Sequence, residues 1–303
     1  MQLLYLLESI RMPVLNECML LITRFGEETA FLVTALIVFW CVDKYKGYYL
    51  MAVGFIGTMA NQILKLICRV PRPWVLDPEF TILEQAREAA AGYSFPSGHS
   101  QSAVGTFGGL AYVTKNKWIR SICIAIAVLV PVSRMYVGVH TPADVLVGSA
   151  MALALVFGLG NFCLSRKKRN MKLLIGAMLV LAVGFLLYVE VFPFPGDFDA
   201  HNLQSGAKNA YTMIGCLTGV AIVYITDERY VRFETKAIWW AQILKVVLGL
   251  VTVLAIKEGL RTPLEMLLPV YPARAVRYFL IVVWAGMGWP STFGFFGKLG
   301  EKR

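Results

Sequence analysis

The chain has 303 residues, of which 57% are hydrophobic and only 16% are charged, and its mean hydropathy is +0.62. This composition excludes an ordinary water-soluble domain of the same length. In a soluble protein the formal net charge of +10 would suggest a nucleic-acid partner. In a membrane protein it indicates basic cytoplasmic loops, so we expect the bilayer and no nucleic acid as a partner.

The N-terminal segment, residues 1–24, is predicted to be an amphipathic helix in the outer membrane interface. Its apolar residues Leu3, Leu7, Ile10 and Val14 recur at helical spacing, as in helices that lie along a membrane surface. It lacks the basic region that opens a secretory signal peptide. If this segment crosses the membrane instead, the orientation of the remaining spans does not change.

Apolar stretches of the length needed to cross a bilayer follow one another to the end of the chain. They predict an all-α, polytopic membrane bundle of about nine transmembrane helices. We see no internal repeat and no linker that would separate soluble domains, and we therefore treat residues 1–303 as a single membrane domain. The predicted spans are 27–43, 47–68, 99–115, 118–136, 142–165, 172–193, 207–226, 237–256 and 274–293.

Basic residues between the spans predict the orientation of the bundle, because cytoplasmic loops carry an excess of Lys and Arg. The densest basic run, at residues 166–172, follows the fifth predicted span. We therefore place the turns after the odd-numbered spans, and the C-terminus, in the cytoplasm. The outer end of the second span, the start of the third and the turn between the fourth and fifth then share the extracytoplasmic face.

Polar clusters lie at all three of these places, and the first one contains Lys65 and Arg72. Together with Arg134 of the third cluster, they put positive charge at the edge of an apolar phase, where charge is costly unless it is paired. No run of carboxylates lies near them in sequence, so a phosphate-like anion is the expected partner. Taken alone, Lys65 or Arg72 could equally be a basic residue that reaches toward lipid headgroups.

The segment between the first two clusters, residues 78–91, could form an amphipathic helix. The solvent-exposed face of this helix would carry Glu79, Glu84, Arg87 and Glu88. We expect a plain surface helix here, and a lid over the site is the less favoured interpretation.

The second cluster is the sequence Tyr93-Ser94-Phe95-Pro96-Ser97-Gly98-His99-Ser100, which opens the third span and contains the motif Pro96-Ser97-Gly98-His99. The free N–H groups of the first helical turn and the positive end of the helix dipole favour an anion there. Gly98 allows the backbone to approach that anion closely. Without the other clusters, the same residues could be only a helix-entry turn with Ser97 as its cap.

The third cluster places His140 four residues before Asp144. Thr141 as the N-cap, Pro142 at the first helical position and Asp144 at the third form the pattern of a capping box. The role of Asp144 could therefore be limited to capping its helix. Asp144 could also hold one ring nitrogen of His140 and leave the other free to act as a nucleophile or base.

Together the three clusters resemble the type 2 phosphatidic acid phosphatase superfamily, which also includes glucose-6-phosphatases and vanadium haloperoxidases. Its pattern is K-x6-R-P, then P-S-G-H, then S-R-x5-H-x3-D. Every fixed position is present, within residues 65–144. The matching residues are Lys65, Arg72, Pro73, Pro96, Ser97, Gly98, His99, Ser133, Arg134, His140 and Asp144.

The resemblance implies a role for each site residue. His140 would attack phosphorus and form a phosphohistidine, Asp144 would orient its ring, and His99 would protonate the leaving oxygen and then activate water. The phosphate oxygens would be held by side chains and one backbone amide, with no metal and no cofactor. This phosphate-binding set is Lys65, Arg72, Ser97, Gly98 and Arg134.

The expected enzyme is an integral membrane phosphatase in a bacterial cell membrane, with its site on the extracytoplasmic face. Its catalytic core would be residues 27–165, and residues 172–303 would be additional C-terminal transmembrane helices of unassigned role. A phospholipid or isoprenoid phosphate is the expected substrate: phosphatidic acid, phosphatidylglycerophosphate, undecaprenyl diphosphate or a sphingoid-base phosphate. The alternatives are a glucose-6-phosphatase-like sugar phosphatase, a lipid phosphotransferase, and a non-catalytic phospholipid-binding or transport protein.

Overall fold

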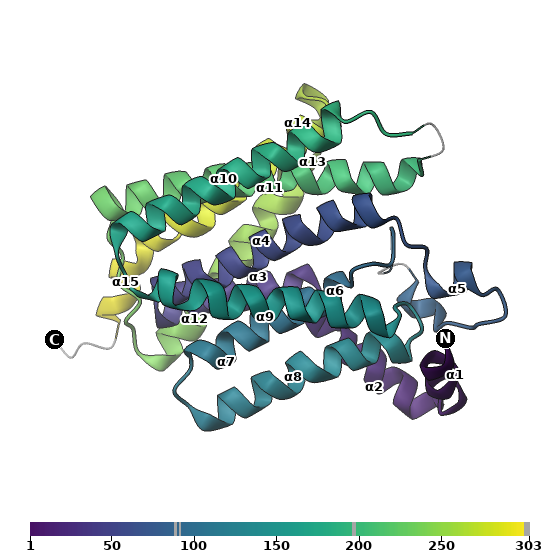
Figure 1. Cartoon of the computed structure of the whole chain (residues 1–303). Helices are drawn as coiled ribbons and strands as arrows, with labels where there is room; N and C mark the ends of the chain where they lie inside the picture. Colours follow the sequence, from purple (N-terminus) through teal and green to yellow (C-terminus); the bar gives the residue numbers. More distant parts are fainter. Residues whose placement is uncertain (88–89, 91, 196–197, 300–303) are drawn as a thin grey trace. The chain divides into compact units, whose positions relative to one another are not determined.

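The computed structural model of the chain describes residues 1–87, 90, 92–195 and 198–299. Helices account for all the regular secondary structure of these residues (Figure 1), which confirms the predicted all-α class. The chain divides into two compact units, which are described separately below. Unit 1 comprises residues 1–34, 49–164 and 195–206, and unit 2 comprises residues 35–48, 165–194 and 207–303.

Seven helices in the described part of the chain are long and apolar enough to cross a membrane. They coincide with seven of the predicted spans, and the protein is therefore a multi-span membrane protein. The predicted third span is a shorter helical run over 98–113, which falls below this length. The predicted count of nine is not confirmed. The seven helical runs are Lys44–Leu76, Lys117–Tyr136, Pro142–Leu164, Lys168–Val191, Ala200–Val231, Trp239–Leu267 and Val270–Lys298.

The N-terminal region holds two helices where a single interfacial helix was expected. They are α1 (Gln2–Ser9) and α2 (Pro13–Thr23), and residues 10–12 separate them. Pro13 at the first position of α2 accounts for part of this break, because proline favours a helix start and disfavours helical backbone in the preceding residue. The run Pro13–Gly26 then joins Glu28–Val42 at an angle of 56°. The predicted first span is thus one arm of a bent helix pair, which could count as an eighth span.

Unit 1 is built around four helical segments (Figure 1). Asn116 caps one of them by accepting hydrogen bonds from the backbone N–H groups of Trp118 and Ile119, at 2.9 and 3.2 Å. Such caps replace the partners that the first turn of a helix lacks. The segments are α4 (Lys44–Cys68) from Tyr49 onward, α6 (Gly98–Ala103) with α7 (Gly109–Val113), α8 (Lys117–Tyr136) and α9 (Pro142–Leu164). Of these, α4 contacts both α6 and α9.

The segment between α4 and α6 differs from its prediction. After the short helix α5 (Pro73–Leu76), the described residues of 78–91 form a turn, an extended stretch and 3₁₀ structure at Glu84–Ala86 and at Ala90, so the predicted amphipathic helix is wrong. Tertiary contacts explain the difference. Thr81 donates its backbone N–H to Glu8 at 3.2 Å, and Tyr5 donates its hydroxyl to Asp77 at 2.7 Å. Glu88 lies outside the described residues.

Unit 2 contains the C-terminal helices and a close helix pair made possible by small residues. A Cβ on Gly215 of α11 would lie 2.2 Å from the carbonyl oxygen of Ala275 in α14, so only glycine fits there. Small residues at such crossings let membrane helices pack closely. The helices are α10 (Lys168–Val191), α11 (Ala200–Thr226) from Ala207 onward, α12 (Trp239–Gly259), α13 (Arg261–Leu267), α14 (Val270–Val283) and α15 (Phe293–Lys298).

Candidate active site

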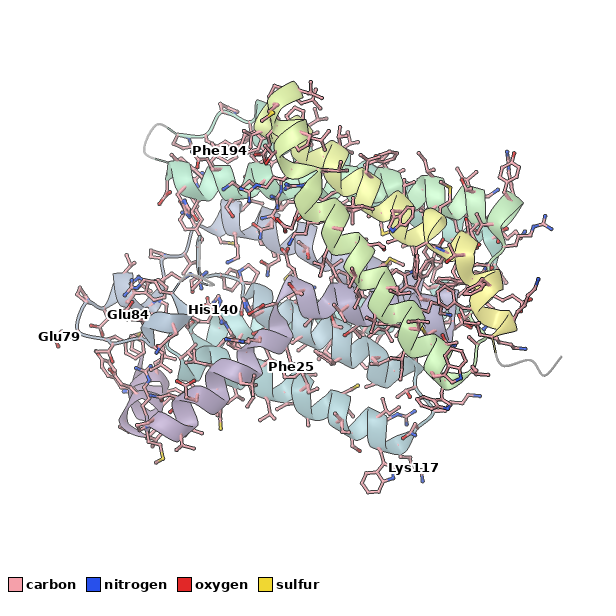
Figure 2. The ribbon with its side chains drawn as sticks, turned by 180° about the vertical axis from the view of Figure 1, so that it is seen from behind. Phe25, Glu79, Glu84, Lys117, His140 and Phe194 are labelled. Carbon is pink, nitrogen blue, oxygen red and sulfur yellow. The ribbon has the colours of Figure 1, made fainter. Side chains whose placement is uncertain are left out.

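The predicted site residues lie at the ends of several helices of unit 1. Figure 2 shows His140 toward the same end of this unit as Glu79 and Glu84, with Lys117 at the opposite end. Lys65 occupies the last turn of α4 and Arg134 the last turn of α8. The three sequence clusters therefore meet at helix termini, where backbone groups are available to hold side chains and ligands.

Arg72 and His140 are the best-defined pair of the site. Arg72 Nη1 lies 3.0 Å from His140 Nε2 and donates to the carbonyl oxygen of Val139 at 2.9 Å, while its Nε donates to Gly92 O at 2.9 Å. The same Nη1 atom is 3.5 Å from His140 Nδ1, so the guanidinium faces the imidazole ring and contacts both of its nitrogens. Arg72 therefore places its positive charge directly beside the His140 ring.

Asp144 lies on the other side of the His140 ring. Its Oδ2 is 3.4 Å from His140 Nδ1, and it also accepts hydrogen bonds from Ser94 Oγ at 2.5 Å and from the Thr141 backbone N–H at 2.7 Å. The Thr141 hydroxyl in turn accepts from the Asp144 N–H at 3.3 Å, which completes the predicted capping box. The carboxylate therefore both caps α9 and faces the histidine, so the two interpretations of Asp144 are compatible.

The second cluster forms the start of α6. Ser97 is the N-cap of this helix, and its hydroxyl accepts hydrogen bonds from the Ser100 N–H at 3.4 Å and the Ser100 hydroxyl at 2.9 Å. Gly98 and His99 occupy the first turn. The Ser97 N–H donates to the carbonyl oxygen of Asp144 at 2.9 Å, which ties this turn directly to α9. The Nε2 atom of His99 is buried and has no hydrogen-bond partner in the described part of the chain.

Lys65 and Arg134 complete the group of buried cations. Lys65 Nζ donates to the carbonyl oxygen of Tyr93. Arg134 is fully buried, and its Nη1 donates to the hydroxyl of Thr23 at 2.8 Å. Its Nε and Nη2 atoms are buried without a partner among the residues described. Buried donors of this kind are normally satisfied, so they indicate a place for an acceptor such as a phosphate oxygen.

The electrostatic environment of His140 favours its neutral form. His140 lies in the turn between α8 and α9, outside the helices that could span the membrane. Burial in the first place, and then the positive charge of Arg72, hold the pKa of its imidazole well below the usual range. A neutral imidazole keeps the lone pair that a nucleophile needs. The site thus combines an anion-binding group of cations with a histidine suited to attack.

The sequence prediction missed two residues that hold the site together. Ser94 is fully buried and bonds Asp144, and Thr23 of α2 bonds Arg134. Ser94 precedes the Pro96 motif by only two positions, so its place in a polar cluster was the available signal. Thr23 is 111 residues from Arg134 in sequence, and nothing local to Thr23 marks it.

The fold and the site define the class of this protein as a helical membrane protein with buried cations around a histidine–carboxylate pair. Comparison with known families makes the assignment specific. Residues 45–169 match the PAP2 superfamily model, and residues 211–302 match the model of a PAP2 superfamily phosphatase transmembrane extension. The chain belongs to the PAP2 superfamily, and it is a phosphatase.

Two relatives identified by sequence agree with this assignment. Phosphatidylglycerophosphatase B of Bacillus subtilis is 32% identical over 168 residues, which cover 50% of this chain and 77% of that protein. An undecaprenyl-diphosphatase of Sulfolobus acidocaldarius is 31% identical, over 46% of this chain and 66% of that protein. A transmembrane PAP2-type phosphatidylglycerolphosphate phosphatase from Bacillus subtilis, known from a crystal structure, is 31% identical in sequence, with a TM-score of 0.46. The match covers 55% of this chain and 84% of the chain in that crystal structure.

Proposed function

We propose that this protein hydrolyses a lipid phosphate or diphosphate without a metal ion, through a phosphohistidine on His140. The observation that carries the proposal is the buried row Arg72–His140–Asp144. Arg72 Nη1 is 3.0 Å from Nε2 and Asp144 Oδ2 is 3.4 Å from Nδ1. A phosphoryl group bound at Arg72 lies against the attacking nitrogen, and the carboxylate stabilises the positive charge that develops on the ring.

The reaction has two steps. First, Nε2 of His140 forms a bond to phosphorus as the bond from phosphorus to the leaving oxygen breaks, and His99 gives that oxygen a proton. Second, His99 removes a proton from water, whose oxygen attacks phosphorus as the N–P bond breaks and phosphate leaves. Cations, one hydroxyl and one backbone N–H hold the oxygens of the phosphoryl group in both steps. These are Lys65, Arg72, Arg134, the Ser97 hydroxyl and the Gly98 amide.

We place the reaction at the extracytoplasmic face of a bacterial cell membrane, on the basis of the basic run at 166–172 and the positive-inside rule. Residues 27–165 are proposed as the catalytic core and residues 172–303 as additional transmembrane helices. The relatives' names, phosphatidylglycerophosphatase and undecaprenyl-diphosphatase, favour a phospholipid or isoprenoid phosphate as substrate. A substrate of this kind can keep its chain in the bilayer while its phosphate enters the site.

The test is phosphate release by purified protein in detergent with EDTA present. The panel is phosphatidic acid, phosphatidylglycerophosphate, undecaprenyl diphosphate, sphingosine 1-phosphate and glucose 6-phosphate. Each substrate is assayed with wild type, with His140→Ala and with His201→Ala. The last is a matched control, because His201 is the third histidine of the chain and is exposed.

We expect turnover of a lipid that survives chelation, is retained in His201→Ala and is lost in His140→Ala. A phosphate label that passes from the substrate to the wild-type protein, and that is labile in acid and stable in base after a quench, would identify the phosphohistidine. Absence of turnover with every substrate would overturn the hydrolase proposal. Equal turnover in wild type and His140→Ala would overturn the role of His140.

A further inference from the structure

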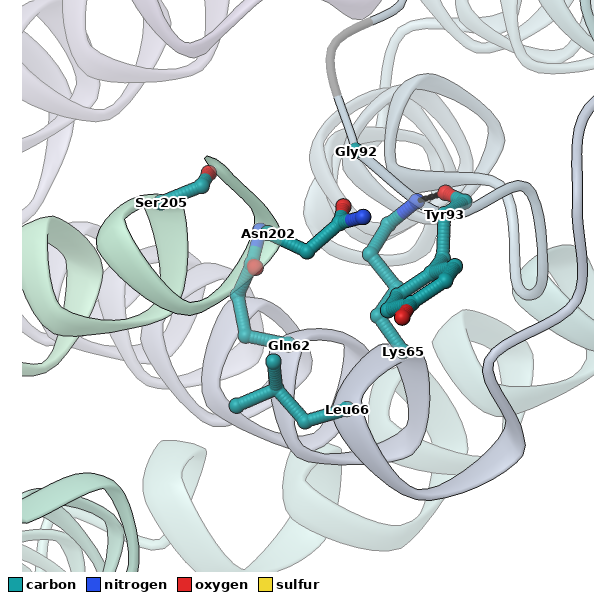
Figure 3. A pocket seen from close by; sticks show the side chains of 7 residues that line it. All are labelled: Gln62, Lys65, Leu66, Gly92, Tyr93, Asn202 and Ser205. Atoms are coloured by element: carbon teal, nitrogen blue, oxygen red, sulfur yellow. Dashed lines mark hydrogen bonds between the residues drawn. The ribbon is translucent and has the colours of Figure 1, made fainter. Parts of the chain in front are cut away.

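A small polar pocket lies next to Lys65, near the end of α4. Part of its wall comes from α4 and part from the loop that leads to Ser94. The rest comes from the first two turns of α11, which belong to unit 1. Lys65 is shared between this pocket and the proposed phosphate site. The residues that line it (Figure 3) are Gln62, Lys65, Leu66, Gly92, Tyr93, Asn202 and Ser205.

The start of α11 is firmly attached to this wall. The ring of Phe198 lies under the guanidinium of Arg69, at 4.8 Å, and meets the ring of Tyr93 edge to face, at 6.0 Å. Asp199 caps the helix by accepting hydrogen bonds from the backbone N–H groups of His201 and Asn202, at 2.8 and 3.1 Å. These contacts fix the position of Asn202 relative to the loop.

Asn202 is the residue that gives the pocket its chemical character. Only 8% of its surface is exposed, and its Oδ1 atom is buried without a hydrogen-bond partner among the described residues. Figure 3 shows its amide directed toward Lys65 and Tyr93. A Cβ on Gly92 would lie 2.9 Å from Oδ1, so the adjacent glycine leaves room for this side chain. A buried acceptor without a donor is destabilising, which favours a ligand that donates a hydrogen bond.

We propose that this pocket is a headgroup subsite that binds a hydroxyl group of the substrate, and that Asn202 thereby favours a phosphorylated polyol headgroup. The inference rests on the proposed function and narrows its substrate class. A hydroxyl can donate to Asn202 Oδ1 and accept from an amide or from Lys65, whereas an ionised phosphate only accepts. Apart from Lys65, the residues that line the pocket are uncharged. A second phosphate would therefore face an amide oxygen with no additional cation to hold it.

The activity test compares kcat/KM for phosphatidylglycerophosphate with kcat/KM for undecaprenyl diphosphate, both in detergent micelles. Asn202→Leu keeps the approximate size of the side chain and removes its hydrogen bonds. We expect the ratio of the two values to fall about tenfold in this variant, as the loss of one good hydrogen bond predicts. His201→Ala, the adjacent exposed residue, is the control and should keep the wild-type ratio. An unchanged ratio in Asn202→Leu would overturn the subsite.

A binding test separates the subsite from the reaction. Two variants are titrated with inorganic phosphate and with glycerol 1-phosphate by calorimetry: His140→Ala, and the double variant that also carries Asn202→Leu. We expect His140→Ala to bind glycerol 1-phosphate about tenfold more tightly than phosphate. The double variant should bind the two probes equally. Equal Kd values in His140→Ala, or no binding of either probe, would overturn the subsite. Failure of the catalytic proposal would show separately, as wild-type protein that releases no phosphate.

Discussion

His140 is the residue whose surroundings make the sharpest prediction about pH. Burial, and then the charge of Arg72, hold its pKa well below the usual range. A lowered pKa means that the neutral, nucleophilic form persists as the pH falls, and protonation removes it only below the ordinary histidine value of about 6.5. We therefore expect the acid limb of the kcat/KM profile to lie below pH ~6.5. An acid limb above that value would contradict the assignment of His140 as the nucleophile.

Ser94 is predicted to support catalysis through Asp144. Its Oγ donates to Asp144 Oδ2 at 2.5 Å and lies 3.4 Å from His140 Nδ1. Ser94→Ala removes one of the hydrogen bonds that orient the carboxylate, while the Thr141 N–H remains in place. We expect kcat to fall about tenfold with a smaller change in KM. Steady-state kinetics would show this, with exposed Ser121→Ala as the matched control. An equal loss in both variants would argue against the role.

At the scale of elements, the N-terminal helices hold the loops that carry the site. Arg11, between α1 and α2, donates from Nε and Nη2 to the carbonyl oxygen of Tyr136 at 3.1 and 3.0 Å, and from Nη1 to Thr81 O at 3.0 Å. Tyr136 is four residues before His140. Between them Gly138 has a φ of +87°, and a Cβ there would lie 2.9 Å from Arg11 Nη2. The turn that presents His140 thus depends on glycine and on Arg11 together.

Arg11→Ala should therefore reduce activity although Arg11 is remote from the reacting atoms. We expect a loss of about tenfold in kcat, because small displacements of a nucleophile are costly. Arg11→Lys should recover little, since one ammonium cannot reproduce the fork that bonds two carbonyl groups. The control is Arg24→Ala, which removes an exposed arginine from the same region. A rise in KM with an unchanged kcat would contradict a positioning role.

The elements that the sequence predicts well are those decided by local chemistry. Asp144, Thr141 and Ser97 lie where helix capping places them, because caps involve residues only three positions apart. The interpretation of 78–91 as a helix fails for the opposite reason. Contacts from Thr81 to Glu8 and from Asp77 to Tyr5, some seventy residues earlier, compete with a continuous helix over this segment. Asn202 shows the same limit, since only the folded chain places it beside Lys65 and Gly92.

At the scale of the whole molecule, the proposed orientation in the membrane can be measured directly. Figure 2 shows Glu79 and Lys117 at opposite ends of unit 1, and both are exposed. In an active, cysteine-free background, Glu79→Cys should react with an impermeant maleimide in intact cells. Lys117→Cys should react only after permeabilisation. The reverse pattern would place the active site on the cytoplasmic side.

Arg134 links the chemistry of the site to the stability of the entire fold. Two of its buried nitrogens have no partner in the described structure, and each unsatisfied group costs roughly 1–3 kcal/mol. We therefore expect a bound oxyanion to stabilise the native state, so vanadate or phosphate should raise Tm. At a ligand concentration of 100 times Kd the free energy of unfolding should rise by about 2.7 kcal/mol. Arg134→Leu should melt at a higher temperature than wild type without ligand and lose the ligand-induced shift. The proposed role of Arg134 in binding phosphate and its contribution to thermal stability are thus predicted to oppose each other.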